Sequence, residues 1–174
     1  MAWYGMVWYV IQTASAKEAV VRQECEKQIP KTILERCILP VYEEKIKYDG
    51  KWHTRTKKLF PGYLFLVSDD VNELCKELGK IEGTTKLLGT GDEVVPLSEK
   101  EVRLLRHLIG EQETMEMSEG IIENDRVVIL SGPLMGMEST IQKIDRHKRK
   151  AWISMEMFGG TQSVEVGLEI IRKV

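Results

Sequence analysis

The sequence predicts an α+β protein made of two small domains. In the first 110 residues, segments with helical spacing alternate with extended segments. From residue 120 onward only short extended runs occur, separated by turn residues. Between these parts, residues 111–119 carry four glutamates and no positive residue, and we expect this stretch to be a linker. A chain of 174 residues can hold two such domains, residues 1–110 and 120–174.

The first domain is expected to begin with a strand over residues 8–13, which are rich in aromatic and β-branched side chains. Ser15 and Glu18 have the spacing of a capping box, which predicts a helix from about residue 16 to residue 29. Pro30 cannot continue that helix and marks its end.

Residues 37–67 have an extended pattern, with Asp49-Gly50 as a hairpin turn signal. Apolar residues at helical spacing follow over residues 71–78, and Gly79 is a suitable C-cap. Residues 87–98 are loop-rich. Ser98 and Glu101 repeat the capping-box spacing and predict another helix that ends near Gly110.

The second domain is expected to be all-β. Its five short runs cover residues 126–130, 139–144, 151–158, 162–166 and 169–174. A domain this small has little with which to cover exposed strand edges, so we expect its strands to close into a barrel.

Composition excludes several functional classes. No apolar run approaches the ~20 residues that a membrane helix needs, and the N-terminus lacks a secretory signal pattern, so we expect a cytoplasmic protein. Cys25, Cys37 and Cys75 are widely separated and are expected to be reduced thiols. No phosphate-binding loop, hydrolase motif or metal-ligand spacing occurs, so we predict no enzyme activity, no metal and no cofactor.

The strongest chemical signal is a cluster of cations at the expected tip of a hairpin in the second domain. The chain has a formal net charge of only −2, yet this short segment concentrates Lys143, Arg146, His147, Lys148, Arg149 and Lys150. Like charges on one turn repel each other and favour an anionic partner. Arg and Lys suit phosphates and guanine edges, so we predict that these residues bind a structured RNA near a bulge or loop. A solubilising surface turn is the alternative interpretation.

Five segments in order resemble the NusG family of transcription elongation factors over nearly the whole chain: "WYVIQT", "FPGYLFL", "IEGTTKLLG...VPLSEKEV", "NDRVVILSGPLMG" and "MEMFGG...VEVGLEII". The resemblance implies an N-terminal NGN domain, an α/β sandwich with an antiparallel sheet, followed by a KOW domain with an SH3-like barrel. The basic tip departs from general members of the family, and the chain is most similar to its specialised LoaP group of antiterminators.

The resemblance also implies that the NGN domain docks onto the clamp helices of RNA polymerase. The aromatic and proline side chains suited to this contact are Tyr9, Phe60, Pro61, Tyr63 and Phe65. Strand alternation places Tyr63 and Phe65 on one face and Leu64 and Leu66 on the other, and either face can be the core. In the KOW domain, Phe158 is a possible contact for a partner protein or a core residue.

Three functional hypotheses follow. In the first, a monomer docks on polymerase and reads an RNA hairpin in the nascent transcript, as a processive antiterminator. In the second, it is a general NusG-type factor whose KOW domain binds Rho or a ribosomal protein. The third is a ribosome-associated KOW protein. Arg55, Lys57 and Lys58 are either contacts for nucleic acid in the polymerase cleft or a solvated strand end.

Overall fold

The computed structural model describes residues 6–14, 16–87, 89–90 and 93–174. They form a mixed α/β structure with a few helices and mostly strands. The chain divides into two compact units. The first comprises the described residues within 1–39 and 60–102, and the second comprises residues 40–59 and 103–174. The predicted domain boundaries at residues 110 and 120 stay a prediction.

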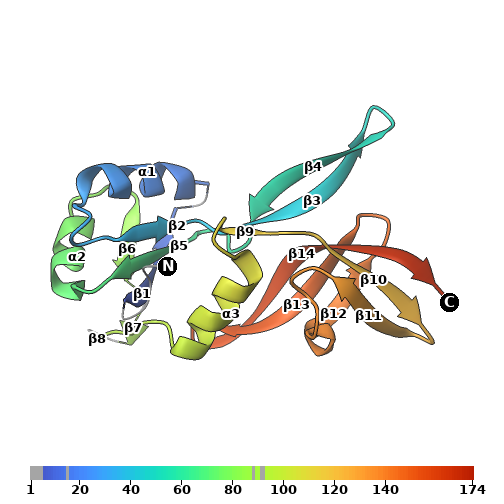
Figure 1. The fold of residues 1–174 in the computed structure, drawn as a ribbon. Coiled ribbons are helices and arrows are strands. Elements are labelled where there is room, and N and C mark those ends of the chain that lie inside the picture. The colour runs from blue at the N-terminus through green and yellow to red at the C-terminus, as the bar shows by residue number, and fades with distance from the viewer. Residues whose placement is uncertain (1–5, 15, 88, 91–92) are drawn as a thin grey trace. The chain divides into compact units, whose positions relative to one another are not determined.

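The first unit is built on a four-stranded sheet with the order β2-β5-β1-β6 (Figure 1). The long central strands β1 (Val7–Thr13) and β5 (Tyr63–Ser68) pair antiparallel from Val7↔Ser68 to Gln12↔Tyr63. The short strands β2 (Arg36–Ile38) and β6 (Thr84–Leu87) form its edges. The strand predicted over residues 8–13 is confirmed.

Two helices contribute to the core of this unit together with one face of the sheet. The core cluster joins Val21 and Cys25 of α1 (Glu18–Gln28) and Leu74 and Leu78 of α2 (Val71–Leu78) to buried residues of β1 and β5. The predicted capping box of α1 rests on Ser15, which lies outside the described residues. The Glu18 carboxylate instead accepts a hydrogen bond from the backbone N–H of Gly62, at 2.8 Å.

The predictions for α2 and for α3 (Glu99–Ile109) agree with the structure. The Asp70 carboxylate caps α2 by accepting from the Glu73 N–H, and Gly79 is its C-cap. The capping box of α3 is complete: Ser98 Oγ accepts from the Glu101 N–H at 3.1 Å, and Glu101 Oε1 accepts from the Ser98 N–H at 3.0 Å. Before α3, the loop-rich segment contains the two-residue strands β7 (Gly89–Thr90) and β8 (Glu93–Val94).

The second unit contains the hairpin of β3 (Val41–Tyr48) and β4 (Lys51–Lys58), which pair antiparallel along their whole length. Asp49 and Gly50 both have positive φ, 52° and 72°, as a two-residue type I′ turn requires. The predicted hairpin turn is therefore confirmed. On its other edge β3 pairs in parallel with β9 (Thr114–Met115), which falls inside the stretch expected to be a linker.

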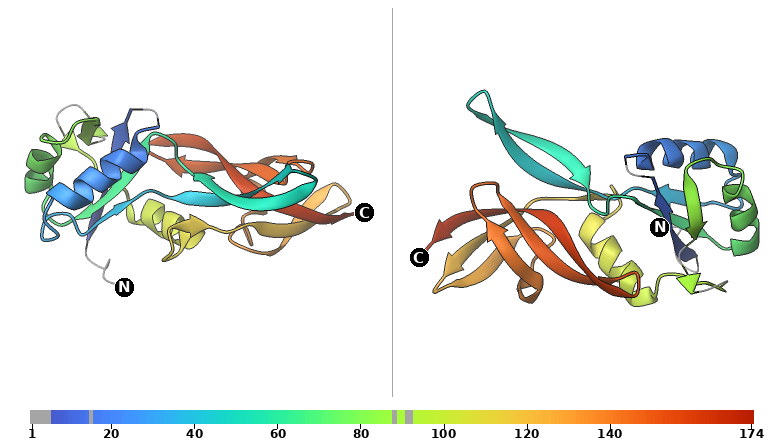
Figure 2. Two further views of the ribbon diagram at one scale, coloured as in Figure 1. Left: turned by 90° about the horizontal axis from the view of Figure 1, so that it is seen from above. Right: turned by 180° about the vertical axis from the view of Figure 1, so that it is seen from behind.

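The other sheet of the second unit has the order β11-β10-β14-β13-β12. Its strands are β10 (Ser118–Glu123), β11 (Arg126–Ser131), β12 (Ile141–Asp145), β13 (Lys150–Met157) and β14 (Gly160–Lys173), with the short 3-10 helix η1 (Glu138–Thr140) before β12. Figure 2 shows β14 as one long ribbon. Two of the predicted strands, 162–166 and 169–174, are therefore one strand, while β10 was not predicted. None of the helices described here is long and apolar enough to cross a membrane.

Candidate functional site

The predicted basic tip is the connection between β12 and β13. Asp145 pairs with Lys150 across the two strands, which leaves residues 146–149 as a four-residue loop. Asp145 Oδ1 accepts a hydrogen bond from the Lys148 N–H at 3.0 Å, and this contact holds the pKa of the Asp145 carboxyl below its ordinary value. Arg149 closes the loop with a positive φ of 56°. This turn geometry presents the loop side chains outward.

The predicted RNA-binding side chains fall into two groups. Lys143, Arg146, His147 and Lys148 are exposed. The Lys143 ammonium lies 4.9 Å from the centre of the Trp152 ring. In the described part of the chain, Arg146 and Lys148 form no ion pair. These two side chains are therefore available to an external anion.

Arg149 and Lys150 differ, because the chain's own acidic groups engage them. The Arg149 guanidinium lies 3.3 Å from Glu169 and 3.9 Å from the centre of the Trp52 ring on β4. The Lys150 ammonium lies 2.9 Å from Glu44 of β3 and 3.3 Å from Glu165 of β14. Only 14% of the Lys150 side chain is exposed. The sequence had suggested a cluster of free cations, and for these two residues the structure gives internal partners.

These ion pairs belong to a network that joins the β3–β4 hairpin to β13 and β14. Glu44 is fully buried and also receives the Arg55 guanidinium at 2.9 Å. Tyr42 donates its hydroxyl hydrogen bond to Glu165, which also pairs with Lys57 at 3.3 Å. Burial alone would raise the pKa of Glu44, but hydrogen bonds from Lys150 and Arg55 outweigh it and hold the pKa below 4.5. The network therefore keeps buried charges ionised.

A glycine allows the backbones of β14 and β3 to approach closely. A Cβ atom on Gly167 would lie 2.3 Å from the Glu43 carbonyl oxygen and 2.3 Å from Met117 Sδ. Glu43 Oε1 also accepts a hydrogen bond from the Met117 N–H at 3.2 Å, which joins β3 to the segment just before β10. The contact between the β3–β4 hairpin and β14 therefore depends on a residue without a side chain.

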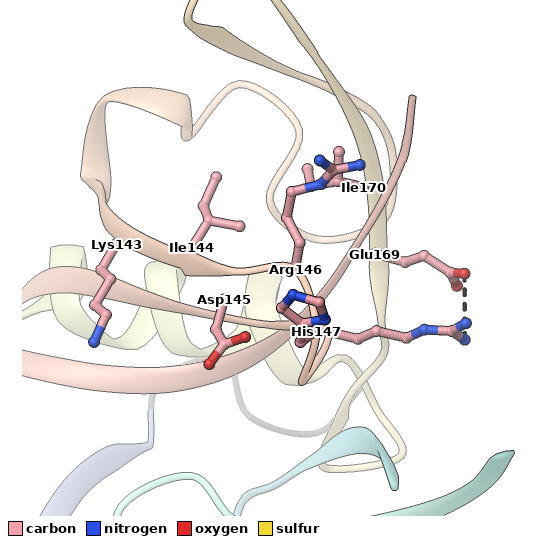
Figure 3. Close-up of a pocket in the computed structure, with 8 residues that line it drawn as sticks. Lys143, Ile144, Asp145, Arg146, His147, Glu169 and Ile170 are labelled. Carbon is pink, nitrogen blue, oxygen red and sulfur yellow. Dashed lines mark ion pairs between the residues drawn. The ribbon is translucent and has the colours of Figure 1, made fainter. Parts of the chain in front are cut away.

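A cavity of about 640 Å³ opens beside the basic loop (Figure 3). Figure 3 shows the Arg146 side chain extending toward Ile170, while Lys143 and Asp145 point to the other side of the strand. Its lining side chains are Lys143, Ile144, Asp145, Arg146, His147, Arg149, Glu169 and Ile170. The cavity therefore combines cations, carboxylates and two aliphatic side chains.

The predicted polymerase contacts lie on different sides of the sheet in the first unit. Tyr9 belongs to the core cluster with Leu64 and Leu66, so the structure favours a packing role for it. Phe65 alternates with these leucines and faces the other way, where its ring meets Phe60 edge-on with centroids 5.6 Å apart. Both phenylalanines are buried in this structure.

Two further predicted polymerase contacts are more accessible. Pro61 is exposed, and Tyr63 is half-buried, with its hydroxyl oxygen accepting from Gln12 Nε2 at 3.1 Å. Leu64 and Leu66 belong to the core cluster, but Phe65 on the opposite face of β5 is also fully buried, so which face contacts polymerase stays a prediction.

Phe158, the predicted contact for a partner protein, lies in the turn between β13 and β14 with a positive φ of 59° and is half-buried.

Sequence reasoning missed the partners of the cations. Glu44, Glu165 and Glu169 belong to no recognisable motif, and the only local signal for Trp52 is an aromatic ring in an otherwise polar strand. Arg55 and Lys57 were expected to meet nucleic acid or solvent, and the structure gives them carboxylate partners. Among the described residues, no group of three or more His, Cys, Asp or Glu could hold a metal ion, and the three cysteines are free thiols.

Comparison with known proteins agrees with this architecture. The family model described as NusG, transcription termination factor nusG, matches residues 6–106. The transcription termination/antitermination protein NusG of Thermus thermophilus is 29% identical over 179 residues, covering 95% of this chain and 97% of its own length. The protein of that name from Borreliella burgdorferi is 28% identical over 180 residues, covering 96% and 98%.

A solved structure described as domain interaction in Thermotoga maritima NusG has the same fold. Its TM-score is 0.62 at 23% sequence identity, and the match covers 96% of this chain and 95% of that one. The family model spans more than half of the chain, and the matched segment contains the four-stranded sheet, α1, α2 and the β3–β4 hairpin. This chain belongs to the NusG family of transcription factors.

Proposed function

We propose that this protein is a processive antitermination factor with an NGN domain that docks on RNA polymerase and a KOW domain that binds structured RNA in the nascent transcript. It would then be a specialised member of the family, similar to the LoaP group. The observation that carries the proposal is the exposed loop of β12 and β13, where Arg146 and Lys148 form no ion pair among the described residues. Such a loop is narrow enough to enter an opened RNA groove near a bulge.

The docking part of the proposal uses the face of the first unit that carries Phe60, Pro61, Tyr63 and Phe65. Aromatic side chains bury much area at little entropic cost and serve as anchors for a helix. The buried members of this set have to become accessible before they can contact polymerase. Once the first domain is docked on polymerase, the short linker raises the effective concentration of the second domain near the RNA to the order of millimolar. Weak RNA contacts are then enough for stable binding.

The second candidate is a general NusG-type factor whose KOW domain binds Rho or a ribosomal protein. Two observations favour it: Arg149 and Lys150 already have carboxylate partners, and Phe158 is partly exposed at a turn. The basic loop would then be incidental to function.

An RNA-binding experiment separates the two candidates. RNA segments cross-linked to the wild-type chain in cells are prepared as short transcripts, and their binding to the full chain is compared with that of scrambled transcripts. The test variant is Arg146→Ala with Lys148→Ala. The matched control is Arg126→Ala with Lys173→Ala, which removes the same charge from exposed positions on the same sheet. Equal binding to both RNAs, or equal loss in both variants, would remove the antitermination proposal.

A further inference from the structure

We propose that the cavity beside the basic loop receives one unpaired guanine base of the bound RNA. This inference rests on the proposed RNA binding and adds a base-specific contact to it. The volume of about 640 Å³ falls within the range of roughly 300–1,000 Å³ that is typical of small-ligand sites. A cavity of this size at the point of RNA contact is suited to a base that has left its stack.

The lining does not resemble a site for phosphate alone. Beside its cations, the lining contains the Glu169 carboxylate, which repels a phosphate, and the aliphatic side chains of Ile144 and Ile170, which give a phosphate nothing to bind. A nucleobase, in contrast, has apolar faces and a polar edge, and it matches this combination of side chains.

The choice of guanine follows from the polar groups. Guanine presents N–H donors on its Watson–Crick edge and acceptors at O6 and N7. The Glu169 carboxylate already meets Arg149 and Lys45, each at 3.3 Å, but a carboxylate has about four acceptor sites and can take further donors. Arg146 offers a planar guanidinium that can stack on the base or donate to its O6 and N7.

The position of Arg146 favours stacking. In Figure 3 its side chain extends toward Ile170, on the same side as Ile144. A base between these side chains would contact aliphatic carbon on one face and the guanidinium plane on the other. Lys148, which is exposed in the same loop, is left to meet the phosphate next to that base.

The test uses the full chain and four fluorescently labelled RNA hairpins that differ at one bulged position: guanosine, inosine, an abasic nucleotide, or no bulge. Inosine lacks the exocyclic amino donor and otherwise keeps the guanine edge. We expect the guanosine hairpin to bind about tenfold more tightly than the abasic hairpin, with inosine between them. In parallel, guanosine monophosphate and adenosine monophosphate are titrated while the methyl NMR signals of Ile144 and Ile170 are followed. Shifts of these two signals with guanosine monophosphate but not with adenosine monophosphate support guanine binding in the cavity.

Two variants connect the effect to the cavity. Arg146→Lys keeps the charge but removes the planar stacking group, so we expect the preference for the bulged guanosine to fall to about twofold while binding of the unbulged hairpin is unchanged. Arg126→Lys is the matched control, because Arg126 is exposed at the start of β11 and does not line the cavity. It should leave the guanosine preference at its wild-type value.

The outcomes distinguish this inference from the proposed function. Equal binding of all four hairpins, or a guanosine preference that survives Arg146→Lys, would overturn the proposal that the cavity binds a guanine base. The proposed RNA binding would not be affected by either result. Binding to none of the four hairpins and to none of the transcripts recovered from cells would overturn both.

Discussion

The carboxylate of Glu44 and the ammonium group of Lys150 lie 2.9 Å apart, and the Glu44 side chain is fully buried. Glu44 belongs to the β3–β4 hairpin and Lys150 to the first position of β13. A residue that looked like part of an RNA-binding surface is thus a structural contact between two strands far apart in the sequence.

Glu44→Gln should destabilise the second unit by about 2 kcal/mol, because Arg55 and Lys150 would each lose a charged hydrogen-bond partner. The measurement is the free energy of unfolding in urea. Glu116→Gln, at an exposed position, is the control and should change the free energy by less than about 0.5 kcal/mol. Equal effects of the two changes would mean that the buried pair adds nothing to stability.

The same pair predicts a pH dependence with a defined sign. The folded pKa of Glu44 lies below 4.5, so its contribution is present above that value and is lost as the pH falls through the lower, folded pKa. The folded pKa of Lys150 lies above 10.5, since attraction to Glu44 and Glu165 outweighs its burial. The contribution of Lys150 is therefore present below 10.5 and is lost as the pH rises through the folded value.

The check is the difference in unfolding free energy between the wild type and Glu44→Gln, followed from pH 7 down to about pH 2. The difference should be constant near neutrality and shrink in acid. A difference that stays the same over the whole range would show that ionisation of Glu44 is not its source.

Gly167→Ala should weaken the packing of β14 against β3, because the added Cβ would meet the Glu43 carbonyl oxygen at 2.3 Å. Overpacking of this kind costs about 1–3 kcal/mol. Thermal unfolding and hydrogen exchange of the β3 amides report the loss. Gly160→Ala is the matched control, since a Cβ there meets nothing within 4 Å. Normal exchange in β3 of the Gly167 variant would contradict the close approach.

Removing Arg146 and Lys148 together should reduce the salt dependence of RNA binding. Each phosphate contact contributes about one to the slope of log affinity against log salt concentration. Lys148 is assigned to a phosphate and Arg146 to a base, so replacing both with alanine should lower the magnitude of the slope by about one. Titrations at several salt concentrations give the slope. The Arg126→Ala, Lys173→Ala control should leave it near the wild-type value, and a similar reduction in the control would indicate a diffuse charge effect.

Ser98→Ala should destabilise α3 by about 1 kcal/mol, because the Glu101 N–H loses its capping acceptor. Circular dichroism during urea unfolding measures the change. Ser163→Ala, at an exposed strand position, provides the comparison. No difference between the two variants would show that the cap is dispensable.

Local signals in the sequence predicted much of the fold. The Asp49-Gly50 turn and the Ser98–Glu101 cap depend on residues close together in the chain, and both occur in the structure. The strand β10 was missed because its first residues continue an acidic stretch that resembles a linker. Its hydrogen bonds come from β11 and β14, and no local pattern reveals them.

The candidate site was predictable only in part, because contacts between residues far apart in the sequence leave no local pattern. The sequence indicates a turn rich in cations, but it does not say which cations have partners. Lys45 and Glu169, for example, are 124 positions apart and meet only in the folded chain. The cavity beside the loop likewise needs Ile170 from β14 next to Ile144 from β12.

The single long strand β14 sets a limit on when the second unit can fold. Its early residues pair with β13, whereas residues 168–173 supply the partners of β10. During synthesis, β10 and β11 therefore emerge before β14, the strand that pairs with β10. Contacts of this kind slow folding, and they leave an unpaired edge on the nascent chain until β14 has been released from the ribosome.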